Sequence, residues 1–306
     1  MKTEKLTIRL HERQNALLAG NGICQSIGMN SCYGIIEEIR KEKNPAADPE
    51  VLEKLQFPHQ IVAATNDHVD ENMKRLTQGM LKAEYSEEDT EFLKDLLDHM
   101  PEFILTANYS TELESAAFGR YTAFTYRTNT WKSAEMRGSA DSLGLNRYTM
   151  IPVGERQKQV WHIHGNAMKP TSIVMGHYYY GKLLREIEEY IPVFLKNYKM
   201  AVSKGEQEIA VRSWVDLFML CDVHILGFSM DPAEMDLWWL LCCKKRHFPE
   251  TQVYFYEPDP ARITNSGKEL LMKAYGANII TTPDFTGDYR QYYRDTIRMI
   301  GGNRNE

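Results

Sequence analysis

The sequence has no C-x-x-C pair, and its cysteines are few and odd in number. They are Cys24, Cys32, Cys221, Cys242 and Cys243. A structural zinc ribbon needs closely spaced pairs of thiolate ligands, and a disulfide framework is typical of small secreted domains. The adjacent Cys242 and Cys243 fall within an apolar helical stretch and suit neither purpose. We therefore expect reduced thiols and no bound metal.

Long apolar runs and an excess of basic residues are also missing. No stretch approaches the roughly 20 apolar residues of a membrane-spanning helix, and the opening residues MKTEKLTIRLHERQ lack the apolar centre of a signal peptide. The formal net charge is −6, whereas nucleic acids and anionic lipids bind basic surfaces. We expect a cytoplasmic protein that binds neither membranes nor, directly, nucleic acid.

With 306 residues, 43% of them hydrophobic, the chain has ample material for a core. Short apolar runs alternate with helical patterns along it. The runs cover residues 15–20, 103–105, 122–126, 160–164, 253–257 and 278–282, together with residues 221–229, which end in a glycine turn. The clearest helical patterns cover residues 31–43, 177–199 and 206–219. This alternation predicts an α/β fold, a Rossmann-like parallel sheet with helices on both faces, in one domain spanning residues 1–306.

Two segments interrupt this alternation. Residues 44–100 begin with several prolines and continue with polar helical patterns, which predicts a helical insertion within the domain. Residues 127–159 form a long polar connection that contains Lys132, Arg137, Arg147 and Arg156. Connections of this length inside a compact domain are usually functional or disordered. A lid over a site and a solvated loop are both consistent with it.

Three stretches carry polar or glycine residues directly after an apolar run. They are residues 17–26 (LLAGNGICQS), 101–114 (PEFILTANYSTELE) and 160–166 (VWHIHGN). Ligands of open α/β sheets bind where such turns meet, at the carboxyl ends of the strands. We therefore expect Asn108, His164 and the turn around Gly20 and Gly22 to face one site. The glycines would let a phosphate approach the backbone and a helix N-terminus.

Each of these features also has a simpler explanation. Asn after an apolar strand is often a turn former. A histidine facing a core is often a structural residue, and His162 lies on the same strand face as His164, which makes it an equal candidate on this pattern alone. The glycine turn lacks the third glycine or alanine of the dinucleotide fingerprint, because Gln25 stands there. A tight turn without a ligand is the more common case. We assign His224 and Cys221 to the core.

Five motifs taken together carry a resemblance. In order they are LLAGNGICQS, ILTANYSTELE, WHIHGN, ILGFSMDPAEMDLWWLL and VYFYEPD. Their order and spacing resemble the sirtuin-like family, and its bacterial NAD-hydrolysing branch more than the zinc-containing protein deacylases. The resemblance spans most of the chain outside residues 44–100.

The resemblance implies a role for each matching position. Asn108 and His164 match the catalytic residues. The residues that match NAD-binding positions are Gly20, Asn21, Gly22, Ser26, Thr106, Tyr109, Gly165, Gly227, Ser229 and Glu257. Two positions depart from the family pattern, since Asn21 replaces an alanine and Ser110 replaces an acidic residue. The missing zinc ribbon disfavours deacylation.

The implied activity is that of an NAD glycohydrolase, with NAD as substrate, nicotinamide and ADP-ribose as products, and no zinc. The resemblance also implies an abortive-infection, anti-phage role, gated by homo-oligomerisation or by a cognate activator protein. Two alternatives remain open. One is an NAD or ADP-ribose sensor without turnover. The other is an assembly subunit of a defence complex that binds its partner through Trp238, Trp239 and the tyrosines near residues 178–190.

Overall fold

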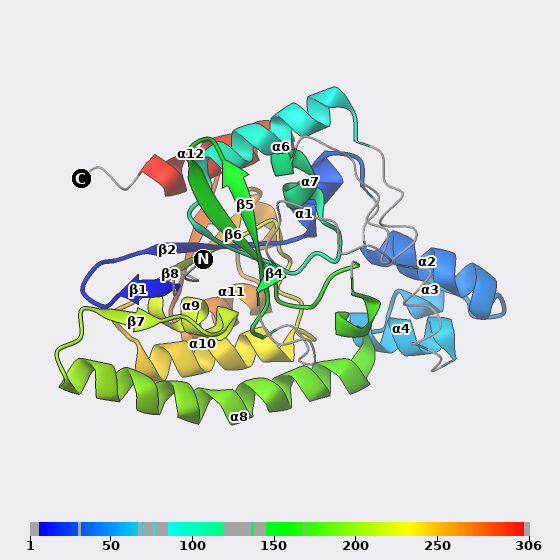
Figure 1. Ribbon diagram of the computed structural model, residues 1–306. Coiled ribbons are helices and arrows are strands. Elements are labelled where there is room, and N and C mark those ends of the chain that lie inside the picture. Colours follow the sequence, from blue (N-terminus) through cyan, green and yellow to red (C-terminus); the bar gives the residue numbers. More distant parts are fainter. Residues whose placement is uncertain are drawn as a thin grey trace.

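The structure is a computed structural model that describes residues 6–29, 32–66, 69, 76, 85–118, 136–137, 145–167 and 169–302. Its centre is an eight-stranded sheet with the strand order β10-β9-β8-β2-β3-β6-β5-β4. The six strands from β10 to β6 are parallel, and β5 and β4 add to one edge in antiparallel fashion. This is the predicted Rossmann-like α/β fold (Figure 1).

The strands of this sheet are β2 (Asn15–Ala19), β3 (Phe103–Thr106), β4 (Met136–Arg137), β5 (Tyr148–Val153), β6 (Arg156–His162), β8 (Asp222–Leu226), β9 (Val253–Glu257) and β10 (Ala277–Thr281). A separate antiparallel pair joins β1 (Thr7–Arg9) to β7 (Glu208–Ala210). The helices are α1 (Asn21–Ser26), α2 (Cys32–Lys43), α3 (Pro49–Leu52), α4 (Phe57–Thr65), α6 (Glu87–His99), α7 (Glu112–Phe118), α8 (Gly176–Ser203), α9 (Trp214–Leu220), α10 (Met235–His247), α11 (Gly267–Ala274) and α12 (Tyr289–Gly302), with short 3-10 turns at Pro170–Ser172 and Pro260–Arg262.

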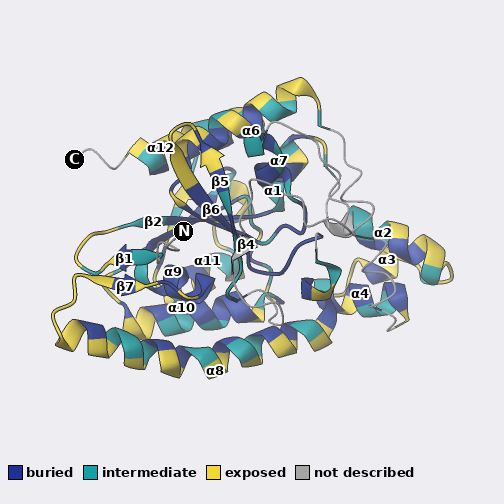
Figure 2. Cartoon of the chain, viewed as in Figure 1, coloured by how far each residue is buried: buried dark blue, intermediate teal, exposed yellow. Residues whose placement is uncertain are grey.

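Helices cover both faces of the sheet because the central strands are apolar on both sides. Along β2, Leu18 packs into the cluster formed with α8, α9 and α10, while its neighbour Leu17 packs into the cluster formed with α6, α7 and α12. In Figure 1 the long helix α8 runs along one side of the molecule, and α6 and α12 lie together on the other. Figure 2 shows buried residues along the central strands and exposed ones on the outer surfaces of α6 and α8.

Residues 44–100 divide into two parts in the structure. Helices α3 and α4 pack with α2 into a third apolar cluster, to which Tyr109, Ile173 and Met175 also belong. Helix α6 instead packs on α12 and α7 as one of the layers that cover the sheet. The spacing of Ser86 and Asp89 predicts a capping box at its N-terminus, and in the structure these two side chains bond each other's backbone N–H groups.

Three parts of the secondary structure differ from the sequence prediction. Residues 127–159 were expected to be an unstructured connection, but they contain β5 and most of β6, joined by a turn at Gly154 with φ of +59°. Residues 206–219 hold the short strand β7 before α9 begins. The sequence at residues 230–232 predicts a helix start, but α10 begins at Met235, because the Asp231 side chain accepts the Ala233 N–H and closes a turn first. The strand expected at residues 122–126 lies outside the described residues.

The core assignments are confirmed. Cys221 and His224 are both buried in β8 or directly before it. Cys24, Cys221, Cys242 and Cys243 are free thiols. Among the described residues, no helix combines the length and the apolar character that crossing a membrane requires.

Candidate active site

A cavity of about 620 Å³ opens at the carboxyl ends of the parallel strands. This volume falls in the range of roughly 300–1,000 Å³ that is typical of small-molecule and cofactor sites. The predicted site residues that line it are Asn21, Gly22, Ser26, Asn108, Tyr109, His164, Gly227, Ser229 and Glu257. Residues from five separate stretches of the chain therefore meet at one site, as the sequence predicted for three of them.

Gly20 and Gly22 are required by the packing of two loops. A Cβ on Gly20 would lie 2.3 Å from the carbonyl oxygen of Gly227, and a Cβ on Gly22 would lie 2.4 Å from the hydroxyl oxygen of Tyr293. The loops are also joined by hydrogen bonds from Gly20 N to Leu226 O (2.9 Å) and from Gly22 N to Gly227 O (2.8 Å). The absent side chains thus let the loops after β2 and β8 meet, whereas the sequence prediction assigned the space to a phosphate.

Asn108 is held by a buried polar network. Its Nδ2 donates to Glu112 Oε1 (3.0 Å), Cys24 Sγ (3.0 Å) and Gly20 O (3.4 Å). Its backbone N–H donates to the side-chain oxygen of Thr106, 3.1 Å away. The amide oxygen Oδ1 forms no hydrogen bond with the described residues. Since Asn108 lines the cavity, this oxygen is the atom that remains to accept a hydrogen bond from a ligand.

The acidic group beside Asn108 is Glu112, in the first turn of α7. Glu112 is buried, and its second carboxylate oxygen accepts a 2.6 Å hydrogen bond from the Ser110 hydroxyl. The sequence prediction treated Ser110 as the loss of an acidic residue. In the structure Ser110 orients a carboxylate that lies two residues further along the chain.

His164 contacts two acidic residues at the start of α10. Its Nε2 lies 2.9 Å from Asp236 Oδ2 and 3.8 Å from Glu234 Oε2. The Tyr180 ring packs edge-on against the imidazole at 5.3 Å between centroids, and the Tyr180 hydroxyl donates to Glu234 Oε2 at 3.1 Å. Asp236 is only 1% exposed, while Glu234 lines the cavity. The imidazole is therefore positioned by α8 and α10 together.

The pKa values of His164 and Glu234 depend on the charges of the neighbouring side chains. Burial lowers the pKa of His164, but the charges of Asp236 and Glu234 and the hydrogen bond to Asp236 outweigh it, so the pKa is raised. Burial raises the pKa of Glu234 to about 7, with His164 and Tyr180 opposing the shift and Asp236 adding to it. A histidine with an ordinary pKa of about 6.5 is largely neutral at neutral pH, and the raised pKa moves His164 toward the charged form.

These three groups also have the composition of a cation site. One nitrogen and two oxygens lie within 4.8 Å of one another. Two ligands of a tetrahedral zinc ion lie roughly 3.3 Å apart, given metal–ligand distances of about 2.0–2.1 Å. The 2.9 Å contact between His164 and Asp236 is the length of a hydrogen bond. We therefore describe the group as hydrogen-bonded, and the expectation of no metal stays a prediction.

His162 does not share the position of His164. Its Nε2 bonds Glu114 Oε1 on α7 and its Nδ1 bonds the backbone oxygen of Asn108, both at 2.8 Å, and it does not line the cavity. Strand β6 ends at His162, and a turn at Gly165, with φ of +78°, redirects the chain. The expectation that both histidines lie on one strand face is therefore wrong, and of the two only His164 reaches the cavity.

Hydrogen bonds join the two stretches that carry Asn108 and His164. Besides the bond from His162 to Asn108 O, the Ala167 N–H donates to Tyr109 O (2.7 Å), and the Tyr109 hydroxyl donates to Val174 O (2.7 Å). Tyr109 lines the cavity, but its hydroxyl is used within the protein. These bonds fix the two turns relative to each other.

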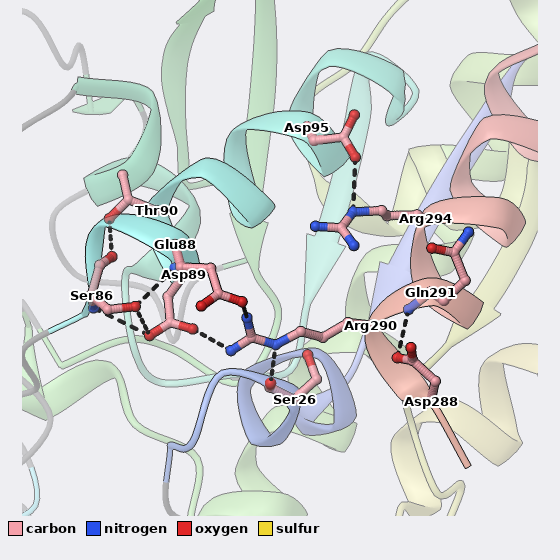
Figure 3. Close-up of polar contacts among 10 residues, drawn as sticks. All are labelled: Ser26, Ser86, Glu88, Asp89, Thr90, Asp95, Asp288, Arg290, Gln291 and Arg294. Atoms are coloured by element: carbon pink, nitrogen blue, oxygen red, sulfur yellow. Dashed lines mark hydrogen bonds and ion pairs between the residues drawn. The ribbon is translucent and has the colours of Figure 1, made fainter. Parts of the chain in front are cut away.

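Ser26 is held in place from α12. Its backbone oxygen accepts a 2.8 Å hydrogen bond from Arg290 Nε, and the remaining guanidinium nitrogens bond Glu88 (3.0 Å) and Asp89 on α6 (Figure 3). Arg290 also lies over the ring of Phe92, 5.4 Å from its centroid. Arg290, which belongs to α12, therefore connects the end of α1 to α6.

Another part of the lining comes from the ends of β8 and β9 and from the helices after them. These residues are Phe228, Ser229, Tyr256, Glu257, Arg262, Lys268, Tyr289, Tyr292 and Tyr293. Lys268 donates to Ser229 O at 2.7 Å. Aromatic rings, a carboxylate and two cations together offer stacking surface, an acceptor for hydroxyl groups and partners for phosphate.

Three predicted binding residues do not line the cavity. Gly20 lies beneath the loop after β8, and the side chain of Thr106 caps the turn of Asn108. Gly165 is required because a Cβ there would lie 2.0 Å from Ser172 O. All three shape the backbone that presents the lining residues.

Sequence reasoning missed four residues of the site. They are Glu112, Tyr180, Glu234 and Asp236. From the sequence alone, the acidic residues after the G-x-S turn indicate only the favourable charge of a helix start, and the tyrosines near residues 178–190 indicate packing or a partner contact. The sequence signal that could have revealed them is the pair of acidic residues Glu234 and Asp236, which lie two positions apart at the start of a helix.

A scan against protein-family models and a search of curated proteins both returned no match.

Proposed function

We propose that the protein is an NAD glycohydrolase, which cleaves NAD with water into nicotinamide, ADP-ribose and a proton. The observation that carries the proposal is that Asn108 and His164, from turns 56 residues apart in sequence (164 minus 108), line one cavity together with Gly22, Ser229 and Glu257. The order of the five motifs, which resembles the NAD-hydrolysing branch of the sirtuin-like family, supports the same reading.

The chemistry matches what these side chains offer. The bond between nicotinamide and ribose breaks through an oxocarbenium-like centre, and nicotinamide leaves as a neutral molecule because it was a cationic pyridinium. No acid is needed for the leaving group. Asn108 Oδ1 accepts a hydrogen bond from a ribose hydroxyl or from the attacking water. His164 takes the proton that this water or hydroxyl releases.

The remaining lining residues suit the rest of the dinucleotide. Glu257, at the end of β9, accepts hydrogen bonds from the adenine ribose, and Lys268 and Arg262 offer positive charge to the pyrophosphate. The tyrosines of α12 provide flat surfaces for the adenine ring.

Nicotinamide release by the purified protein tests the proposal. We expect release by the wild type, alone or with proteins encoded beside it, and a loss of roughly 10²- to 10⁴-fold in kcat for Asn108→Ala and for His164→Ala. His247→Gln serves as the matched control, because His247 is exposed at the end of α10 and does not line the cavity. Binding of NAD without release under every condition would contradict hydrolysis and favour a sensor.

We further propose that the activity is gated and serves abortive infection in defence against phage. Uncontrolled loss of NAD harms the cell that makes the enzyme, so an active state must depend on a signal. The resemblance points to oligomerisation or a cognate activator protein as this signal. Addition of the activator should raise nicotinamide release, and equal release with and without any partner would contradict gating.

A further inference from the structure

The two nitrogens of the His164 ring have different surroundings. Nε2 is 2.9 Å from Asp236 Oδ2, whereas Nδ1 forms no hydrogen bond with the described residues. Asp236 is 1% exposed and is absent from the cavity lining, while His164 belongs to that lining. Asp236 therefore does not line the cavity itself, and its hydrogen bond to the lining is the one to His164.

A buried carboxylate fixes the tautomer of a neutral imidazole. An ionised carboxylate only accepts hydrogen bonds, so the nitrogen that faces it carries the proton. For His164 this places the hydrogen on Nε2 and leaves the lone pair on Nδ1. The lone pair is the proton acceptor of a general base.

We propose that Asp236 is the positioning residue of the site, which holds His164 in the Nε2–H tautomer so that Nδ1 is the base atom. The inference rests on the proposed function only for its link to catalysis. The tautomer itself is a property of the free protein. When Nδ1 accepts a proton, the charge of Asp236 stabilises the imidazolium that forms.

The other groups near His164 do not replace Asp236. Glu234 Oε2 lies 3.8 Å from Nε2, beyond hydrogen-bond distance, and already accepts the Tyr180 hydroxyl. Tyr180 meets the imidazole with its ring edge, and the Tyr109 hydroxyl donates to Val174 O. The charges that raise the pKa of His164 against the effect of burial are those of Asp236 and Glu234. Loss of one of them must lower this pKa.

Substitution Asp236→Asn tests the proposal through the pH dependence of kcat. Asn lacks the charge and can donate to Nε2, which favours the wrong tautomer. We expect kcat at neutral pH to fall by about 10²-fold or more and KM for NAD to change less than about threefold. The decrease of kcat that the wild type shows toward lower pH should be absent from the residual activity of the variant. Asp222→Asn is the control, because Asp222 is also a buried carboxylate, 6% exposed, and it accepts the Gln252 N–H away from the cavity.

Nitrogen-15 NMR of the histidine rings gives a second readout that needs no substrate, with His164→Gln identifying the signal. We expect the Nε2–H tautomer in the wild type and its loss in Asp236→Asn. An Nδ1–H tautomer in the wild type, or an unchanged kcat and pH profile in Asp236→Asn, would overturn the proposal. If the wild type shows the expected tautomer but releases no nicotinamide, the hydrolase proposal fails and the positioning role stands.

Discussion

At the scale of single residues, the site consists of buried polar groups whose partners are other buried polar groups. Glu112 is held by Ser110 and Asn108, and Asp236 by His164. One carboxylate oxygen of Asp236 has no hydrogen-bond partner in the described part of the chain. Groups held in this way cost free energy of folding and are retained where they serve a ligand or a reaction.

The free-energy cost of burying Glu234 can be measured through the pH dependence of the stability of the folded protein. Its pKa of about 7 in the folded protein exceeds its ordinary value of 4.5, so the folded protein binds the proton more tightly than the unfolded chain does. The contribution of Glu234 is therefore most favourable below about pH 4.5 and is lost as the pH rises through 7. Glu234→Gln mimics the protonated form and keeps an acceptor for Tyr180.

We predict that Glu234→Gln exceeds the wild type in stability by about 1–3 kcal/mol at pH 8 and that this gap closes toward pH 5. Urea unfolding at both pH values measures it, with Glu250→Gln, an exposed glutamate, as the control. A gap of the same size at pH 5 and pH 8 would show that Glu234 is not the group that titrates.

At the scale of elements, α12 supports the cavity from two directions. Its tyrosines line the cavity, and Arg290 holds the end of α1 by the Ser26 carbonyl while pairing with Glu88 and Asp89 on α6 (Figure 3). Helix α1 carries Asn21 and Gly22 at its start, so movement of α1 moves the lining.

Arg290→Ala should therefore affect both stability and substrate binding. We predict a loss of about 1–3 kcal/mol in the free energy of unfolding, since charged hydrogen-bond partners are left without their donor, and a several-fold rise in KM for NAD. Arg298→Ala is the matched control, because Arg298 lies on the same helix, is half exposed and pairs only with Asp95 in the described structure. Equal effects of the two substitutions on KM would contradict a role of Arg290 in holding α1.

At the same scale, the sequence predicted the parallel strands well because each is a short apolar run that ends at a turn. Val253–Glu257 was predicted with the observed bounds, and β2 ends one residue before the predicted end. Strand β7 was missed because it is three residues long and exposes Glu208 and Ala210, and β5 was missed because its apolar residues lie in a segment that is mostly polar. The reason for Gly20 and Gly22 was also missed, since it depends on the loop after β8, about 200 residues away in sequence.

At the scale of the whole molecule, the topology brings the site together. Strands β2, β3, β6, β8 and β9 are parallel neighbours, so the turns after them open at one edge of the sheet. The partners of His164 could not be predicted, because α10 meets the turn after β6 only in the folded protein. The tryptophans considered as partner contacts, Trp238 and Trp239, both pack against the core, while Tyr178 on α8 is exposed.

The measurement that tests the account most directly is a crystal structure of the His164→Ala variant with NAD, in which slow turnover preserves the substrate. We predict the nicotinamide ribose beside Asn108 and the position of the deleted imidazole, with the adenine ribose at Glu257 and the adenine against the tyrosines of α12. NAD bound outside this cavity, or bound with the adenosine beside Asn108, would contradict the assignment of Asn108 and His164 to the reacting ribose.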